Sequence, residues 1–180
     1  MVPTLTATLG VKGHRPVVGT RDCKDTLYVF GVLNLVSGAV HANTLESLQA
    51  ENRRASDGKT RRMQRAFAKH PHHIGQAHFR EKNPRVVLTI DNAPWHRGPL
   101  IDAAMRENPH LEFYRMPSYS PQLNVIERFW KTLRWRATHN RLFDTIADMK
   151  ASVRNSLRYF QTVRSRMLSL INGQPKKIPK

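Results

Sequence analysis

The chain contains little cysteine and few acidic residues. The first shortage excludes an internal disulfide, and the second leaves a large excess of positive charge. Cys23 is the single cysteine among 180 residues, so no disulfide can form within the chain. Asp and Glu number 13 against 30 Lys and Arg, which gives a formal net charge of +17. A surplus of this size indicates an anionic partner, such as the phosphates of a nucleic acid, and says little about the fold.

Long apolar runs are lacking as well. No stretch approaches the 18 consecutive apolar residues of a membrane span. Met1 to Leu9 has neither the charged start nor the long apolar core of a signal peptide. With 39% hydrophobic residues, the chain is still long enough for one domain with a core. We therefore expect a cytoplasmic protein with no membrane partner.

Branched and aromatic residues predict strands in the front half of the chain. They fill residues 26–35 and 39–45, and Ser37-Gly38 between the two runs is a hairpin turn signal. Together with Val17-Val18, these runs predict an antiparallel meander.

A polar, basic stretch follows at residues 46–84 and suggests an insertion or a mobile lobe. Within it, Thr60 to His70 is predicted to be helical, because Met63, Ala66 and Phe67 then share one face.

The second half alternates between strand and helix patterns. A continuous apolar strand at residues 85–90, a helix at 100–108 and a strand at 111–115 predict a βαβ unit with parallel strands. Ser120 and Pro121 suit the start of a further helix. A last helix is predicted over residues 145–163, and residues 167–180 are predicted to be a basic, disordered tail.

Two carboxylates in this half are candidate metal ligands. Asp91 directly follows the apolar strand, at the end where ligands collect in open α/β sheets. Glu127 lies about two turns into the helix after Pro121, beside the apolar Leu123 and Trp130. Together they could hold Mg²⁺, which prefers oxygen ligands. Two such ions, about 3.5–4 Å apart, can activate a water or a 3′-hydroxyl.

Structural roles explain the same residues without metal chemistry. Asp91 could cap a turn with Asn92, and Glu127 could form a salt bridge with Lys131 or Arg128. His96 is either a solvated turn histidine or a phosphate contact, and Trp95 either packs or stacks on a base. A further histidine cluster lacks both cysteine and tight helical pairing, so zinc is not expected; its members are His70, His72, His73 and His78.

Two motifs carry a resemblance to a known family. Asp-Asn-Ala-Pro-Trp-His at residues 91–96 and Pro-Ser-Tyr-Ser-Pro-Gln-Leu-Asn-Val-Ile-Glu-Arg-Phe-Trp at residues 117–130 resemble the DDE transposases of the mariner-like superfamily, in its bacterial insertion-sequence branch. The resemblance also takes in Gly13-His14-Arg15-Pro16 and Val29 to Val32, and so covers most of the chain.

This resemblance implies a fold, a reaction and a site. The fold is α/β, a ribonuclease-H-like mixed sheet flanked by helices, with the catalytic domain at residues 1–166. Such enzymes use Mg²⁺ or Mn²⁺, two ions in an intact site, to cut double-stranded DNA at element ends and join 3′-hydroxyls to a target. By resemblance, Asp91 is the second catalytic acid and Glu127 the third. The DNA-facing rim would consist of Asn92, His96, Asn124, Arg128 and Lys131.

The chain departs from the family at its front. The family's first catalytic Asp precedes the segment matched by Gly13 to Pro16, yet no acid occurs here before Asp22. Asp22 and Asp25 precede a later strand and are not expected to replace it. No helix-turn-helix for binding element ends is visible either. We therefore expect the C-terminal part of a transposase, with its first strand truncated, from a decayed copy, a mis-called start or a split reading frame.

Such a chain would be inactive alone, and the intact protein would act as a homodimer associated with the bacterial nucleoid through DNA. One alternative is a non-catalytic, DNA-binding transposase remnant, because the C-terminal part is rich in arginine and phosphate contacts position DNA without reading its sequence. Another is a ribonuclease-H-like nuclease that acts on RNA–DNA hybrids.

Overall fold

The computed structural model describes residues 12–14, 17, 19, 25–48, 58–78, 80–118 and 124–172. Cys23, Asp22 and the helix start predicted at Ser120-Pro121 lie outside this part of the chain. Within it, no helix combines the length and the apolar character that crossing a membrane requires.

The front half forms the expected hairpin. Strand β1 (Thr26–Leu33) pairs antiparallel with β2 (Val40–Ser47), with Thr26 opposite Ser47. Gly38 has a φ of 68° in the turn, a conformation that glycine adopts at no steric cost. The predicted third strand is not seen: Val17 is not in a strand, and Val18 lies outside the described residues.

The predicted helix in the basic stretch is present but longer than expected. Helix α2 (Lys59–Ala77) continues through Pro71, where the pattern suggested an end at His70. A proline inside a helix removes one backbone hydrogen bond, at a cost of about 3 kcal/mol. Burial of Pro71 and Ile74 offsets that loss, because the added turns pack against the strands. Helix α2 is thus packed into the core along one face.

The βαβ unit agrees with the prediction. Strand β3 (Val86–Ile90) and strand β4 (Leu111–Arg115) are parallel, with Val86 opposite Leu111. They are joined by the turn at Pro94–His96 and by helix α3 (Pro99–Arg106), which begins with proline at its first position.

The described residues 124–172 form three helices: α4 (Ile126–Ala137), α5 (Ile146–Thr162) and α6 (Arg164–Ile171). The predicted helix at residues 145–163 matches α5. The tail was predicted to begin at residue 167, but residues 167–171 belong to α6, and the side chain of Met167 is fully buried. Its burial against the α4–α5 core explains why this stretch folds.

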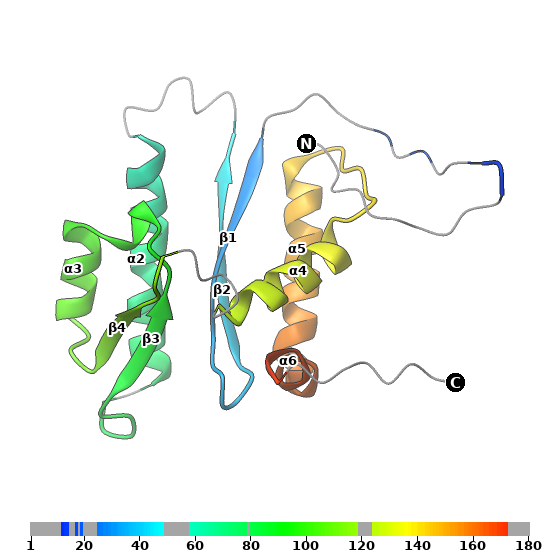
Figure 1. Cartoon of the computed structure of the whole chain (residues 1–180). Coiled ribbons are helices and arrows are strands. Elements are labelled where there is room, and N and C mark those ends of the chain that lie inside the picture. Colours follow the sequence, from blue (N-terminus) through cyan, green and yellow to red (C-terminus); the bar gives the residue numbers. More distant parts are fainter. Residues whose placement is uncertain are drawn as a thin grey trace.

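The β1–β2 hairpin runs between two groups of helices (Figure 1), and apolar clusters pack on both of its sides. On one side, Phe30 packs with Met63 and Phe67 of α2. On the other, Val40 packs with Phe129 of α4 and Phe160 of α5. Helices α2 and α3 therefore cover one side of the strands, and α4, α5 and α6 the other.

The one mixed sheet that was expected is not confirmed. Among the described residues there are two separate sheets of two strands, β1–β2 and β3–β4. The protein is α/β, as predicted, but β1 and β3 do not pair with each other.

Candidate active site

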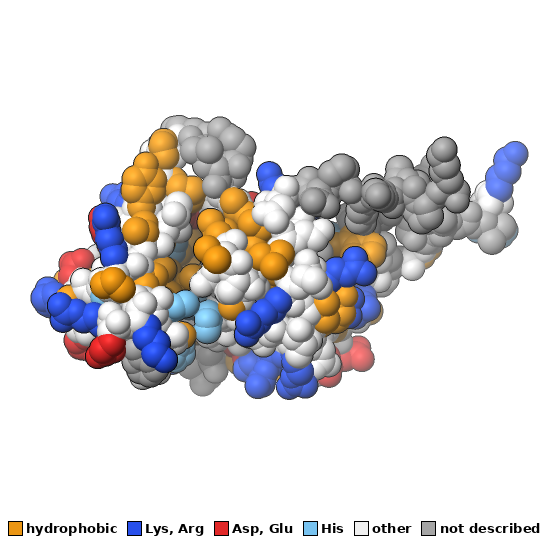
Figure 2. Space-filling view, turned by 90° about the horizontal axis from the view of Figure 1, so that it is seen from below, with side chains coloured by type: hydrophobic (Ala, Val, Ile, Leu, Met, Phe, Trp, Pro, Cys, Tyr) orange, Lys and Arg blue, Asp and Glu red, His pale blue; other side chains and the backbone are white. Residues whose placement is uncertain are grey.

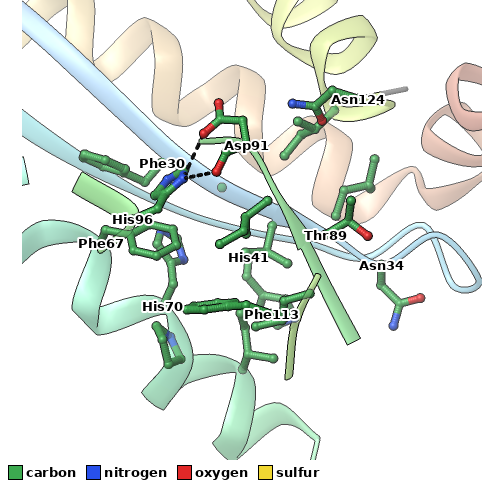
Figure 3. Close-up of a pocket in the computed structure, with 18 of the residues that line it drawn as sticks. Phe30, Asn34, His41, Phe67, His70, Thr89, Asp91, His96, Phe113 and Asn124 are labelled. Atoms are coloured by element: carbon green, nitrogen blue, oxygen red, sulfur yellow. Dashed lines mark hydrogen bonds and ion pairs between the residues drawn. The ribbon is translucent and has the colours of Figure 1, made fainter. Parts of the chain in front are cut away.

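Asp91 is the first residue after β3, where the strand pairing ends and the chain turns. Its Oδ1 accepts hydrogen bonds from the backbone N–H of Ala93, at 3.0 Å, and from Nδ1 of His96, at 2.9 Å (Figure 3). The Ala93 bond is the Asx-type turn that the sequence suggested. The Asp91 side chain is nevertheless 53% exposed, so the structural role leaves the carboxylate accessible.

His96 faces inward, unlike the solvated turn histidine that was one of the two roles considered from the sequence. Its side chain is only 13% exposed, and its ring centroid lies 4.1 Å from that of Phe67. The short turn at Pro94–His96 brings the ring back over the strand end, where α2 supplies Phe67. Nδ1 faces two oxygens of Asp91, the carboxylate and, at 3.4 Å, the carbonyl. Nδ1 must therefore carry the proton.

This contact fixes the charge of the carboxylate. The hydrogen bond from His96 lowers the pKa of Asp91; burial opposes the shift, and the hydrogen bond from Ala93 supports it. Asp91 is therefore a carboxylate at neutral pH. Asp91 would therefore present its ionised form, which is the form that coordinates, to a metal ion or a cationic donor.

The turn after β3 is tied to the end of β4. Nδ2 of Asn92 donates to the carbonyl of Met116, and Arg97 donates to Oδ1 of Asn92. Arg115 donates to the carbonyl of His96. These bonds hold the loop that carries Asp91, so Asn92 has a structural partner at both ends of its amide.

Glu127 lies in the first turn of α4, not two turns into it as predicted. Within the described residues the helix begins at Ile126, and the N–H of Glu127 donates to the carbonyl of Asn124. The helix dipole stabilises a carboxylate in this first turn. The salt bridge considered from the sequence is absent among the described residues: Arg128 donates to the carbonyl of Ile171 instead.

One cavity of about 570 Å³ brings the two acids to the same space. Asp91 and Glu127 both line it, together with His96 and Asn124. Figure 3 draws Asp91 between His96 and Asn124. Seen from below, apolar and histidine side chains border the hollow between the two halves of the molecule (Figure 2). The structure thus joins the two acids, which lie 36 positions apart in the sequence.

The remaining rim residues divide into two groups. Asn124 lines the cavity, whereas Arg128 and Lys131 lie exposed on α4. Trp95 is half-buried and packs in the core around Phe67, which is the packing role that the sequence left open.

Two histidines, His70 and His41, also line the cavity. The sequence pointed to His70 only as a possible zinc ligand, and it did not single out His41. His70 is 2% exposed, and burial, with neighbouring histidines, lowers its pKa to about 4. Burial also lowers the pKa of His41, with a contribution from His78. Neither ring nitrogen of His70 has a hydrogen-bond partner. The described residues contain no group of three or more His, Cys, Asp or Glu arranged to hold a metal ion.

The fold and the site together define a class of protein. It is an α/β protein in which one carboxylate at the end of a strand and another at the start of a helix line the same cavity. A family model described as DDE superfamily endonuclease matches residues 3–150. The chain belongs to this family, and the resemblance to the DDE transposases of the mariner-like group is confirmed.

One curated relative supports the assignment. The chain is 29% identical over 70 residues to the Insertion element IS630 uncharacterized 39 kDa protein of Shigella sonnei. The match takes in 39% of this chain and 20% of that protein, so the chain matches only a fifth of the relative's length. No solved structure matches the chain.

Proposed function

We propose that this chain carries two of the metal ligands of a transposase that cleaves DNA strands and transfers them to a target. The observation that carries the proposal is the shared cavity, where Asp91 at the end of β3 meets Glu127 at the start of α4. The membership of the endonuclease family supports the reaction class. The finer expectation of a ribonuclease-H-like sheet belongs to the same proposal.

The donor set fits Mg²⁺ or Mn²⁺. Of the two oxygens of Asp91, Oδ1 accepts both hydrogen bonds, which leaves Oδ2 for an ion. Glu127 is exposed to the cavity side of α4 and makes no ion pair among the described residues. Mg²⁺ is commonly held by one or two carboxylates, with water and phosphate oxygens completing its shell. When bound, such ions would activate the attacking oxygen and stabilise the leaving one.

The neighbouring residues would then have distinct tasks. His96 orients Asp91 and keeps it ionised through the bond at 2.9 Å. Asn124, Arg128 and Lys131 would contact the phosphates of double-stranded DNA around the cavity. The protein would act as a homodimer on element ends and target. We expect no cleavage by this chain alone. The sequence contains no acidic residue before Asp22, so nothing in that part can serve as the first member of the triad.

Metal binding is the direct test. We expect Mn²⁺, followed by the relaxation of water protons, to bind Asp91→Asn and Glu127→Gln at least about tenfold more weakly than the parent chain, since each variant removes one charged oxygen ligand. Asp102→Asn, which removes an exposed carboxylate on α3, is the matched control and should bind as the parent does. Equal affinity in all four proteins would refute the metal assignment.

A second candidate is DNA binding without catalysis, favoured by the net charge of +17. It predicts DNA binding that is independent of Asp91 and Glu127. The metal measurement separates the two candidates. A remnant without a metal site would bind DNA, and replacing Asp91 or Glu127 would not change its affinity for Mn²⁺.

A further inference from the structure

Trp135 is the one large apolar side chain that α4 turns to the solvent. It is 66% exposed, whereas every other apolar residue of α4 is buried or half-buried. The two other tryptophans of the chain each contact a ring: Trp95 that of His96, and Trp130 that of Phe129. Among the described residues, no ring and no cation lies on Trp135. Its indole is therefore open to a ligand.

The helical pattern of α4 sets Trp135 on a ridge with two cations. Phe129 and Leu133 point into the core that α4 shares with α5. Residue 135 lies about 200° around the helix from Leu133, at 100° per residue, and so faces away from that core. Arg128 and Lys131, at i−7 and i−4 from Trp135, share its face. The outer ridge of α4 thus begins with basic side chains and continues to the indole.

The cations nearest in sequence to Trp135 divide between two tasks. The guanidinium of Arg136 lies 3.9 Å from the centroid of the Tyr159 ring, and so is turned toward α5. Lys131 and Arg134 are exposed and form no ion pair among the described residues. These two side chains are available to phosphate groups on either side of the indole.

This arrangement fits an unpaired nucleic-acid strand. A protein partner would require a contiguous apolar patch, and charged residues are depleted at the centre of such interfaces. An unpaired strand alternates phosphates with base faces, which match cations and an aromatic ring in turn. In a duplex, neighbouring base pairs cover the base faces, so a ring on a helix ridge cannot stack on them. Charge complementarity therefore favours an unpaired strand over a protein.

The position of the ridge relates it to the two acids. Trp135 lies about 12 Å beyond Glu127 along α4, at 1.5 Å per residue. Glu127 borders the cavity that Asp91 also lines. A strand held along the ridge by Lys131 and Arg134 would therefore place an unpaired base only a few nucleotides from these acids.

We propose that Trp135 stacks on an unpaired base of a DNA strand, while Lys131 and Arg134 hold the phosphates beside that base. The inference rests on the proposed function for the choice of DNA as the ligand. It adds the form of DNA that this surface takes, which is a locally unpaired strand next to the site. Stacking of this kind tolerates any base sequence, because every base has an aromatic face.

Three DNA probes test the proposal: a thymine oligonucleotide, the same oligonucleotide with abasic residues, and a blunt duplex. Fluorescence anisotropy measures the binding of each to the 180-residue chain at one salt concentration, without divalent ions. We expect Trp135→Ala to weaken binding of the thymine strand at least about fivefold, because one stacking contact is lost. Binding of the abasic strand and of the duplex should change by less than about twofold, since neither offers a free base.

Two further variants serve as controls. Trp135→Tyr keeps an aromatic face and should retain most of the affinity for the thymine strand. Tyr114→Ala removes an aromatic side chain on β4 that is 60% exposed, and should bind all three probes as the parent does. Urea unfolding checks that the variants fold. If Trp135→Ala does not fold, Trp135→Tyr and the parent's preference for the thymine strand over the abasic strand decide.

The salt dependence separates stacking from charge. Trp135→Ala should leave the slope of log affinity against log salt unchanged, because the indole carries no charge. Lys131→Ala and Arg134→Ala should each reduce the slope for the thymine strand by about 0.7, the share of one phosphate contact in a single strand.

Three results would overturn the proposal. The first is equal affinity of the parent chain for the thymine and abasic strands. The second is a loss in Trp135→Ala that is as large for the abasic strand or the duplex as for the thymine strand. The third is a changed salt slope in Trp135→Ala, which would mean that the substitution acts through the phosphate contacts.

The outcome is separable from that of the metal assignment. The DNA measurements contain no divalent ion, so they do not depend on Asp91 and Glu127. If Mn²⁺ binding is indifferent to these acids, the proposed function fails while the stacking result stands. If Mn²⁺ binding requires them but Trp135→Ala binds the thymine strand as the parent does, only the stacking inference fails.

Discussion

His70 shows how a single side chain can set the acid stability of this fold. It is fully buried among Phe30, Phe67 and its own helix, and its pKa is lowered to about 4. In the unfolded chain a histidine titrates near 6.5. Above that value both states are neutral, and His70 adds no pH dependence. Between about 6.5 and 4 the unfolded state binds the proton and the folded state does not, so stability falls as the pH falls.

We therefore predict that His70→Phe changes both the stability and its pH dependence. At pH 7 the free energy of unfolding should rise by about 1 kcal/mol, because two unpaired buried nitrogens disappear. The loss of stability between pH 7 and pH 4, of which His70 accounts for at most about 3 kcal/mol, should shrink. Urea unfolding at the two pH values measures both effects. The exposed His14 offers the control His14→Phe, and an unchanged pH dependence in His70→Phe would contradict the account.

At the same scale, Asp91 and His96 illustrate what residue types alone convey. The sequence identified Asp91 because it follows an apolar strand directly. It did not reveal that His96, five residues on, bonds to the same carboxylate. The reason is that the ring is held by Phe67, which belongs to α2 and is distant in the sequence.

Among the elements, α5 is the one whose start is best determined locally. Thr145 accepts from the N–H of Asp148, and the Asp148 carboxylate accepts from the N–H of Thr145. This reciprocal pair satisfies backbone donors that the first turn of a helix leaves free.

We predict that Thr145→Ala lowers the free energy of unfolding by about 1 kcal/mol, since one cap bond is lost. The control is Thr162→Ala at the other end of α5, where the hydroxyl only returns to the carbonyls of Arg158 and Tyr159. That change should cost less than about 0.5 kcal/mol. Chemical denaturation measures both variants, and equal costs would argue against the cap.

For the whole molecule, charge is the dominant property. Lys and Arg outnumber Asp and Glu by 30 to 13, and basic side chains are spread over the face drawn in Figure 2. On the helices after the second motif, exposed members include Arg134, Arg136, Arg154, Arg158, Arg164 and Arg166. Such a surface binds phosphate backbones through counterion release, which makes affinity depend on salt.

We predict that the affinity for duplex DNA falls by about 10³-fold or more between 50 and 200 mM salt, as for a protein with six or more phosphate contacts. Replacing both Arg154 and Arg158 by Ala should reduce the log–log slope by about 2, because two contacts are lost. Fluorescence anisotropy at several salt concentrations gives the slope. Arg106→Ala on α3 is the control on the opposite half of the molecule. A flat salt dependence in the parent chain would exclude phosphate contacts as its main source of affinity.

The sequence by itself determined the local elements and the family. Periodicity and turn residues gave the hairpin, the βαβ unit and α5, because these depend on neighbours along the chain. The two motifs identified Asp91 and Glu127, and family membership bears out the resemblance on which they rest. Whether these acids hold a metal stays a prediction.

The tertiary structure decided the features that depend on distant contacts. Helix α2 runs past Pro71, and residues 167–171 join α6, because packing compensates for weak local signals. It also placed Asp91 and Glu127 on one cavity and His96 against Phe67. Among the described residues, it also showed that β1 and β3 border that cavity without pairing with each other. Strand pairing between distant segments has no local signal in a sequence, so only the folded arrangement could show which strands pair.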